Sequence, residues 1–323
     1  MTPTPALARS APGALRRHLL GSASLRAVLA SLAQVGVPAL PLKGPVLAEA
    51  LYDPPEERPF TDLDLLVRRA DAPAALGVLA ALGYRHLPGG RPLEHEVGHA
   101  AGAVFVREDD PVSVPIDLHW ELVAPAGVVR RFPVPVEEVW ARSVPAPEWG
   151  SLTRRLSTED LLLYLALHLA LHHPLGGGRW RQDIIRLLDR FGAVLDWAAV
   201  GERAERWGVR AAVAFALAGV GAGPGGEAWP VPPSLRPERL RAALIGRLAS
   251  RPAGEGRLDH VAALLVAGSL PALAATIVTG VLPPPAWVRA RYGTPRAARG
   301  YVKHLGRLAS SVRRALARCP SDR

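Results

Sequence analysis

Apolar residues recur along the chain at two spacings, and the dominant spacing changes about halfway. Before residue 150, apolar positions three and four apart predict helices, and alternating or continuous apolar runs predict strands. The expected helices span residues 15–34, 45–52 and 71–83, and the expected strands span 37–43, 60–67, 103–108 and 112–120. This half of the chain therefore predicts a small mixed sheet with flanking helices.

After about residue 150 the pattern becomes almost wholly helical. Ser157 followed by Asp160 is typical of a capping box at the start of a helix. Further helices are expected over residues 181–207, 209–220, 236–250, 257–282 and 296–318. The sequence thus indicates an α+β fold in two parts, an α/β domain over residues 1–150 and an all-helical C-terminal domain over residues 151–323.

Two aspartates stand two positions apart in the strand expected over residues 60–67. Residues i and i+2 of a strand point to the same face, so the carboxylates of Asp62 and Asp64 repel each other. Leu63 and Leu65 point to the opposite face and enter the core. Hard divalent cations such as Mg²⁺ prefer carboxylate oxygens and would relieve the repulsion. The pair indicates a metal site, but such pairs also occur on solvent-facing strands, so further residues have to decide.

Three further features strengthen this prediction. Asp117 lies on another apolar strand, where it shares a face with His119. Lys43 and Gly44 stand between a strand and a helix that begins at Pro45, and free N–H groups at a helix N-terminus attract phosphate. Lys43 is also one of only two lysines in the chain, and its compact ammonium suits a phosphate neighbour.

Five short motifs follow one another in a recognisable order. They are LKG at 42–44, LY at 51–52, Arg58, DLDLLV at 62–67 and DLHW at 117–120. This order resembles the DNA polymerase β-like nucleotidyltransferase superfamily, and more narrowly a poorly characterised bacterial nucleotidyltransferase family. The helical stretches LALHLALHH, RWRQDIIRLL and VLPPPAWVRARYG are also similar to that family. The resemblance covers most of the chain and implies a polymerase β-like core.

The resemblance implies transfer of a nucleotidyl group, with AMP from ATP as the expected group, onto a hydroxyl or phosphate acceptor. Asp62 and Asp64 are then expected to hold two Mg²⁺ ions, one of them together with the triphosphate. Asp117 is expected to bind the second ion and to help activate the acceptor for attack on the α-phosphorus, with release of pyrophosphate. His119 and His168 are expected to orient the acceptor.

The glycine turn departs from the pattern of the superfamily. Most members have Gly-Ser or Gly-Gly at this turn, whereas this chain has Lys-Gly-Pro. The phosphate contacts of the missing serine are therefore expected from Lys43 and Arg58, beside the backbone of Gly44. Arg179, which follows a flexible LGGG loop, and Asp183 are also expected to contact the nucleotide.

A second motif points to different chemistry. His95, Glu96 and His99 form an H-E-x-x-H pattern, which binds zinc in metallopeptidases when it lies on a helix. Gly98 and the strand expected from residue 103 disfavour a helix there. A zinc metallopeptidase therefore stays an alternative, as does a non-catalytic relative that only binds a nucleotide.

Composition narrows the setting and the partners. The net charge of +10 comes from arginines scattered along the chain, so a nucleic-acid partner is not favoured. The single cysteine, Cys319, excludes an intramolecular disulfide and fits a reducing cytoplasm. The first twenty residues lack the pattern of a secretory signal.

Residues 261–282 are uncharged and long enough for a membrane span, but Pro271 and many small residues favour two short buried helices. We expect a cytoplasmic enzyme with a nucleotide donor and an unidentified acceptor.

Overall fold

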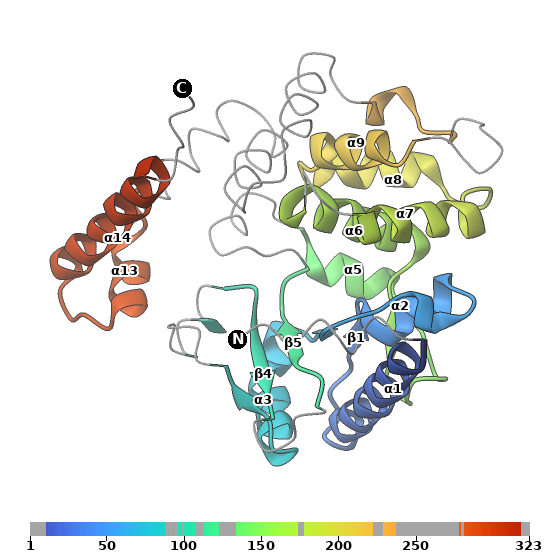
Figure 1. Ribbon diagram of the computed structural model, residues 1–323, viewed down its shortest axis with the longest axis horizontal. Coiled ribbons are helices and arrows are strands. Elements are labelled where there is room, and N and C mark those ends of the chain that lie inside the picture. The colour runs from blue at the N-terminus through green and yellow to red at the C-terminus, as the bar shows by residue number, and fades with distance from the viewer. Residues whose placement is uncertain are drawn as a thin grey trace.

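The computed structural model describes residues 11–87, 93, 96–97, 100–107, 113–122, 134–173, 178–221, 229–236, 278 and 281–317 of the 323-residue chain (Figure 1). The helices are α1 (Ala11–Gln34), α2 (Gly44–Leu51), α3 (Ala72–Ala81), α5 (Val136–Arg142), α6 (Thr158–His172), α7 (Gly178–Phe191), α8 (Trp197–Arg206), α9 (Arg210–Gly219), α13 (Pro285–Tyr292) and α14 (Ala297–Ala317). Short 3₁₀ turns are η1 (Pro55–Glu57), η2 (Arg69–Asp71) and η3 (Pro233–Leu235). The strands are β1 (Leu40–Pro41), β2 (Leu63–Leu66), β3 (Arg85–His86), β4 (Gly102–Val106), β5 (Ile116–His119), β6 (Val144–Pro145) and β7 (Arg154–Arg155).

Five strands form one mixed sheet in the order β1-β2-β5-β4-β3. β2 and β5 run parallel, and the other neighbouring strands of this sheet run antiparallel. The strands expected over residues 103–108 and 112–120 are present as β4 and β5, which pair antiparallel. β6 and β7 form a separate two-stranded ribbon. The mixed sheet with flanking helices that the sequence indicates is therefore confirmed.

Side chains alternate across the two central strands. On β2, Leu63 and Leu65 belong to a buried cluster that also contains side chains of α1 and α3. Asp64 lies between them in sequence and points to the opposite face, because successive side chains of a strand alternate. On β5, Ile116 belongs to the same cluster and Asp117 points away from it. The alternation places both carboxylates on the face away from α1 and α3.

Four helices after residue 157, α6 to α9, pack together beside this second face. α6 is apolar on nearly all sides and lies at the centre, in contact with α7, α8 and α9. Leu42 and Leu66 from the first half of the chain share one buried cluster with Leu163 and Leu167 of α6. One apolar core thus extends across residue 150, and the division into two domains at that point stays a prediction.

The single helix expected over residues 181–207 is wrong, because the structure has two helices there, α7 and α8. The chain leaves α7 at Gly192, whose N–H still donates to the carbonyl of Leu188 at 2.7 Å. Asp196 then caps α8 by accepting the N–H of Ala199 at 3.0 Å. Helical spacing of apolar residues continues through the break, so the spacing alone does not reveal it.

Two other expectations concern helix ends and the C-terminal part. Ser157 caps α6 as expected, since its hydroxyl accepts the N–H of Asp160 at 3.2 Å. The helices expected over residues 236–250 and 257–282 fall almost entirely outside the described residues and stay predictions. α13 was not expected from the sequence; Gly293 caps its C-terminus, and the helix packs against α14. Within the described part of the chain, no helix is both long and apolar enough to cross a membrane.

Candidate active site

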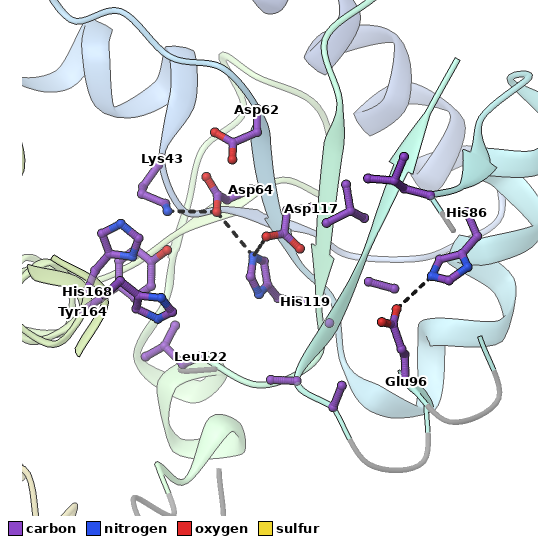
Figure 2. A pocket seen from close by; sticks show the side chains of 17 residues that line it. Lys43, Asp62, Asp64, His86, Glu96, Asp117, His119, Leu122, Tyr164 and His168 are labelled. Atoms are coloured by element: carbon purple, nitrogen blue, oxygen red, sulfur yellow. Dashed lines mark hydrogen bonds and ion pairs between the residues drawn. The ribbon is translucent and has the colours of Figure 1, made fainter. Parts of the chain in front are cut away.

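Asp64 and Asp117 lie side by side because they are register partners in the parallel pairing of β2 and β5. His119, two residues further along β5, points to the same face (Figure 2). Its Nε2 lies 3.3 Å from Oδ1 of Asp64 and 3.4 Å from Oδ2 of Asp117. One ligand atom from each of these three side chains lies within 4.8 Å of the other two. The group can therefore hold a metal ion.

The carboxylate of Asp64 is almost completely buried, with 4% of its surface exposed. The Nζ atom of Lys43 lies 2.9 Å from its Oδ1. Burial raises the pKa of Asp64, but the charge of Lys43 and the hydrogen bond with His119 outweigh burial and hold this pKa well below its usual range. Asp64 is therefore ionised near neutral pH, and Lys43 and His119 supply its counter-charges.

His119 packs against a position of β4 that has no side chain. A Cβ atom built on Gly102 would lie 2.6 Å from the carbonyl oxygen of Leu118 and 3.2 Å from Nδ1 of His119, so a glycine is needed there. Burial lowers the pKa of His119, but the carboxylates of Asp117 and Asp64 outweigh burial and raise it to about 10. The protonated ring thus balances part of the negative charge at the site.

Asp62 precedes β2 and is half-buried. Burial and the negative charge of Asp64 raise the pKa of Asp62, while Lys43 acts in the opposite direction. Figure 2 shows its carboxylate beside that of Asp64. Asp62 does not belong to the group of three side chains that could hold one ion, which consists of Asp64, Asp117 and His119. Burial and the carboxylate of Asp64 therefore both disfavour the ionised form of Asp62, and a bound cation would favour it.

Lys43 and Gly44 form the turn between β1 and α2. Gly44 has a φ angle of +65°, a left-handed conformation that favours glycine. Pro45 occupies the first turn of α2, where a missing N–H leaves no hydrogen bond unmade. The turn directs the ammonium of Lys43 to Asp64 and brings Gly44, the first residue of α2, to the wall of a cavity.

Two cavities meet at this turn. Both are lined by Lys43, Asp62, Asp64 and His168. The larger, of about 340 Å³, extends past Asp117 and His119 and is also lined by His86, Leu87, Glu96, Leu122, Tyr164 and His172. The smaller, of about 230 Å³, is also lined by Gly44, Arg58, Thr61, His173, Arg179 and Trp180. Carboxylates and imidazoles therefore line both cavities, and among the described lining residues guanidinium groups occur in the smaller cavity alone.

Arg58, Tyr52 and Asp183 form a buried network behind the smaller cavity. Nε and Nη2 of Arg58 lie 2.8 and 2.9 Å from the two carboxylate oxygens of Asp183, and the hydroxyl of Tyr52 donates to the same carboxylate at 2.7 Å. Arg58 lines the cavity, while Asp183 lies behind it with 0% of its surface exposed. Asp183 thus holds Arg58 at the wall of the cavity, and the nucleotide contact expected from Asp183 stays a prediction.

Arg179 and His168 reach the cavities from the helices. The guanidinium of Arg179 donates to the carbonyl of Pro59 at 2.8 Å and lies over the ring of Trp180, 4.8 Å from its centroid. His168 lines both cavities. Burial and the charge of Lys43 hold the pKa of His168 well below its usual range, so the imidazole is neutral at pH 7 and can donate or accept one hydrogen bond.

Sequence reasoning did not assign His86, Tyr164 or Trp180 to the site. His86 comes from β3, Tyr164 from α6 and Trp180 from α7. The pattern of apolar residues predicts such elements but does not say which of them lie beside β2. One signal was present in the stretch LALHLALHH, where histidines interrupt an otherwise apolar helix. Polar side chains inside an apolar helix need partners, and here they face the cavities.

Comparison with known families decides the class of protein. A family model described as "Uncharacterised nucleotidyltransferase" matches residues 3–221. The chain belongs to this family. The match includes the three aspartates of the site, and the family makes the protein a transferase of nucleotidyl groups. Searches of curated proteins and of solved structures found no match.

The zinc site considered as an alternative lies mostly outside the described residues. His95 and His99 are not among them, so the zinc hypothesis stays a prediction. Glu96 is described, and its Oε2 lies 2.8 Å from Nε2 of His86. Both side chains line the larger cavity together with Asp117.

Proposed function

We propose that the protein transfers a nucleotidyl group, with ATP as the expected donor and Mg²⁺ as the expected cation, to a hydroxyl or phosphate acceptor. One observation supports this most strongly. Asp62 and Asp64 line both cavities, and Asp117 lines the larger cavity beside them. A donor in one cavity and an acceptor in the other would meet at these carboxylates.

The residues at the junction of the cavities fit divalent cations. Asp64, Asp117 and His119 offer ligand atoms within 4.8 Å of one another, and Asp62 adds a carboxylate beside that of Asp64. When bound, two Mg²⁺ ions would stabilise the charge on the attacking and leaving oxygens. His119 can offer a nitrogen ligand once a metal displaces its proton, and because imidazole suits transition metals better than Mg²⁺, Mn²⁺ is a second ion to test.

We assign the triphosphate of the donor to the smaller cavity. Arg58 and Arg179 line this cavity, Lys43 lies at its boundary, and α2 begins there at Gly44. Guanidinium groups bind phosphate oxygens through charge-assisted hydrogen bonds. Because Asp183 already holds Arg58 through two hydrogen bonds, Arg58 loses little side-chain entropy when phosphate binds.

We assign the acceptor to the larger cavity. Asp117 and His119 line it with 29% and 14% of their side chains exposed. For a hydroxyl acceptor, Asp117 takes the proton and the oxygen attacks the α-phosphorus. The new bond joins the acceptor oxygen to phosphorus, the bond to the bridging oxygen breaks, and pyrophosphate leaves. His119 and His168 orient the acceptor from two sides of the cavity.

Calorimetry tests the donor site first. ATP, GTP, CTP and UTP are titrated with Mg²⁺ into the wild type and into the Asp62→Asn/Asp64→Asn double variant. We expect metal-dependent binding of one nucleotide to the wild type and its loss in the double variant. Asp64→Asn alone is expected to reduce transfer by about 10³-fold with the fold intact, as measured by circular dichroism.

Asp189→Asn is the matched control, because it removes one carboxylate from an exposed position of α7. It is expected to leave nucleotide binding unchanged. Full transfer activity in Asp64→Asn, or nucleotide binding that persists in the double variant, would contradict the proposal.

A further inference from the structure

The larger cavity has a second pair of polar side chains, His86 of β3 and Glu96. In Figure 2 the pair lies across the cavity from Lys43, with Asp117 and His119 between. Nε2 of His86 lies 2.8 Å from Oε2 of Glu96, and 18% and 14% of the two side chains are exposed. The transfer chemistry proposed above uses neither residue, so the pair needs a separate explanation.

The backbone around Glu96 is anchored to the sheet. The N–H of Ala100 donates to the carbonyl of Glu96 at 2.8 Å, and the indole of Trp120 donates to the carbonyl of Ala100 at 2.8 Å. Arg69 holds the neighbouring residue through a hydrogen bond of 2.6 Å to the carbonyl of Val97. A side chain on backbone held in this way is preorganised for binding.

The charges around the cavity favour one class of ligand. Glu96 and Asp117 are carboxylates on two sides of it, and Asp62 and Asp64 stand at its junction with the smaller cavity. Among the described residues that line it, Lys43 is the only lysine or arginine, and Asp64 already neutralises it at 2.9 Å. No lysine or arginine among these lining residues offsets the charge of Glu96, so an anionic group beside Glu96 is repelled, whereas a hydroxyl group can donate to it.

Apolar side chains complete the wall. Leu87, Leu122 and the buried ring of Tyr164 line the same cavity. Small-molecule sites combine such apolar surfaces with a few polar groups that set the orientation of the ligand. Carboxylate and imidazole groups for hydroxyls, together with apolar faces for carbon, suit a polyhydroxylated molecule.

We propose that His86 and Glu96 recognise the acceptor, and that the acceptor is a polyhydroxylated molecule without negative charge, of the size of a monosaccharide or cyclitol. One hydroxyl lies at Asp117 and becomes the nucleophile, while a second donates to Glu96. His86 holds Glu96 in place and bonds to a neighbouring oxygen of the acceptor. The inference rests on the proposed transfer reaction and narrows its acceptor from a hydroxyl or phosphate to a hydroxyl.

Matched pairs of acceptors test the charge of the ligand. Full-length protein, Mg²⁺ and the nucleotide that binds are incubated with glucose, ribose or myo-inositol, and with a monophosphate of each, and pyrophosphate release is measured. We expect release with at least one uncharged compound and at least about tenfold slower release with its phosphate. Equal or faster release with the phosphate, or release with none of the uncharged compounds, would overturn the proposal.

Glu96→Gln tests the role of the residue, since it keeps the shape and removes the charge. We expect the KM of the uncharged acceptor to rise about tenfold, the preference for it over its phosphate to narrow, and the Kd of the nucleotide to stay unchanged. Glu137→Gln, at an exposed position of α5, is the control and changes none of these. Unchanged KM and preference in Glu96→Gln would refute the assignment. If the wild type binds no nucleotide at all, the proposed transfer itself fails, which separates the two results.

Discussion

Two clusters of charged side chains lie next to each other in this protein, and they differ in how far their positive and negative charges cancel. Around Asp183, the guanidinium of Arg58 neutralises the carboxylate and Tyr52 adds a hydrogen bond. Around Asp64, three carboxylates outnumber the ammonium of Lys43 and a protonated imidazole. The charges of the first cluster are balanced, although Arg58 also lines the smaller cavity, whereas the second cluster keeps excess negative charge and borders both cavities.

The difference separates residues that hold the structure from residues that are free to bind. A buried carboxylate whose charge is neutralised by ion pairs holds together the helices that carry its partners. Asp160 of α6 is an example, since it pairs with Arg142 of α5 and Arg203 of α8 at 3.0 Å each. A cluster with excess negative charge destabilises the protein when no ligand is bound, and a bound cation removes this repulsion. Lack of balance, rather than burial, therefore distinguishes the candidate active site.

Removing the charge of Asp183 should break the balanced cluster and has the largest expected effect on stability. In Asp183→Asn, Arg58 keeps a buried charge without a counter-ion, so we expect the free energy of unfolding to fall by about 3–5 kcal/mol. Nucleotide affinity should fall as well, because Arg58 is no longer fixed. Urea denaturation and nucleotide titration measure the two effects.

The same helix offers the control for this variant. Asp189 is exposed on α7, and Asp189→Asn should change the free energy of unfolding by less than about 0.5 kcal/mol. If Asp183→Asn costs no more than Asp189→Asn, the cluster around Asp183 does not hold the helix to the sheet.

Gly102→Ala should disturb the negatively charged cluster around Asp64, because His119 of that cluster packs against Gly102. The new Cβ would lie 2.6 Å from the carbonyl of Leu118, so β4 and β5 must separate and His119 must shift. We expect a loss of about 1–3 kcal/mol in the free energy of unfolding, together with weaker Mn²⁺ binding. Thermal denaturation and metal titration measure these changes.

Gly77→Ala is the matched control, and its effect on the free energy of unfolding should have the opposite sign. Gly77 is exposed in α3, and nothing lies within 4 Å of a Cβ built there. Alanine favours the helix over glycine by about 1 kcal/mol, so this variant should be slightly more stable than the wild type. Equal losses in the two variants would show that close packing at Gly102 is not the cause.

The histidines of the larger cavity should differ in their pH dependence. Burial and the charge of Lys43 lower the pKa of His172 from 6.5 to about 4. Below pH 6.5 the unfolded chain binds a proton at His172 that the folded chain does not, so the free energy of unfolding falls as the pH drops toward 4, by on the order of 2 kcal/mol. His119 has the opposite sign, since its pKa is raised to about 10 and its stabilisation is lost as the pH rises through that value.

Urea unfolding at pH 7.5 and pH 5.0 measures the contribution of His172. The difference in unfolding free energy between the two pH values should be smaller in His172→Gln than in the wild type. Identical differences in the two proteins would show that His172 is not held neutral by its surroundings.

Local rules explain how much of the site the sequence could reveal. The alternation of β2 places Leu63 in the core and Asp64 on the other face, and the strand ending in DLHW repeats this alternation with Asp117. The Lys-Gly-Pro turn predicts the start of α2, because Gly44 tolerates the left-handed backbone of the turn and Pro45 favours the first turn of a helix. These features depend on neighbours within a few residues in the chain, so they can be predicted from the sequence before the tertiary structure is known.

Partners distant in sequence could not be predicted in this way. Arg58 and Asp183 are 125 residues apart in sequence, so no local pattern reveals the two hydrogen bonds that join their side chains. His86 and Glu96 likewise become a pair only when the chain brings β3 and the segment before β4 together. The break between α7 and α8 was missed because apolar spacing continues through it.

The sequence by itself determined the alternating strands, the glycine turn, the capped helices and the three aspartates with their family. These follow from backbone preferences and side-chain periodicity, which act over short distances. Only the tertiary structure decided which charges are neutralised and which remain open to a ligand. That choice depends on distances of about 3 Å between side chains from separate elements, and no local pattern encodes them.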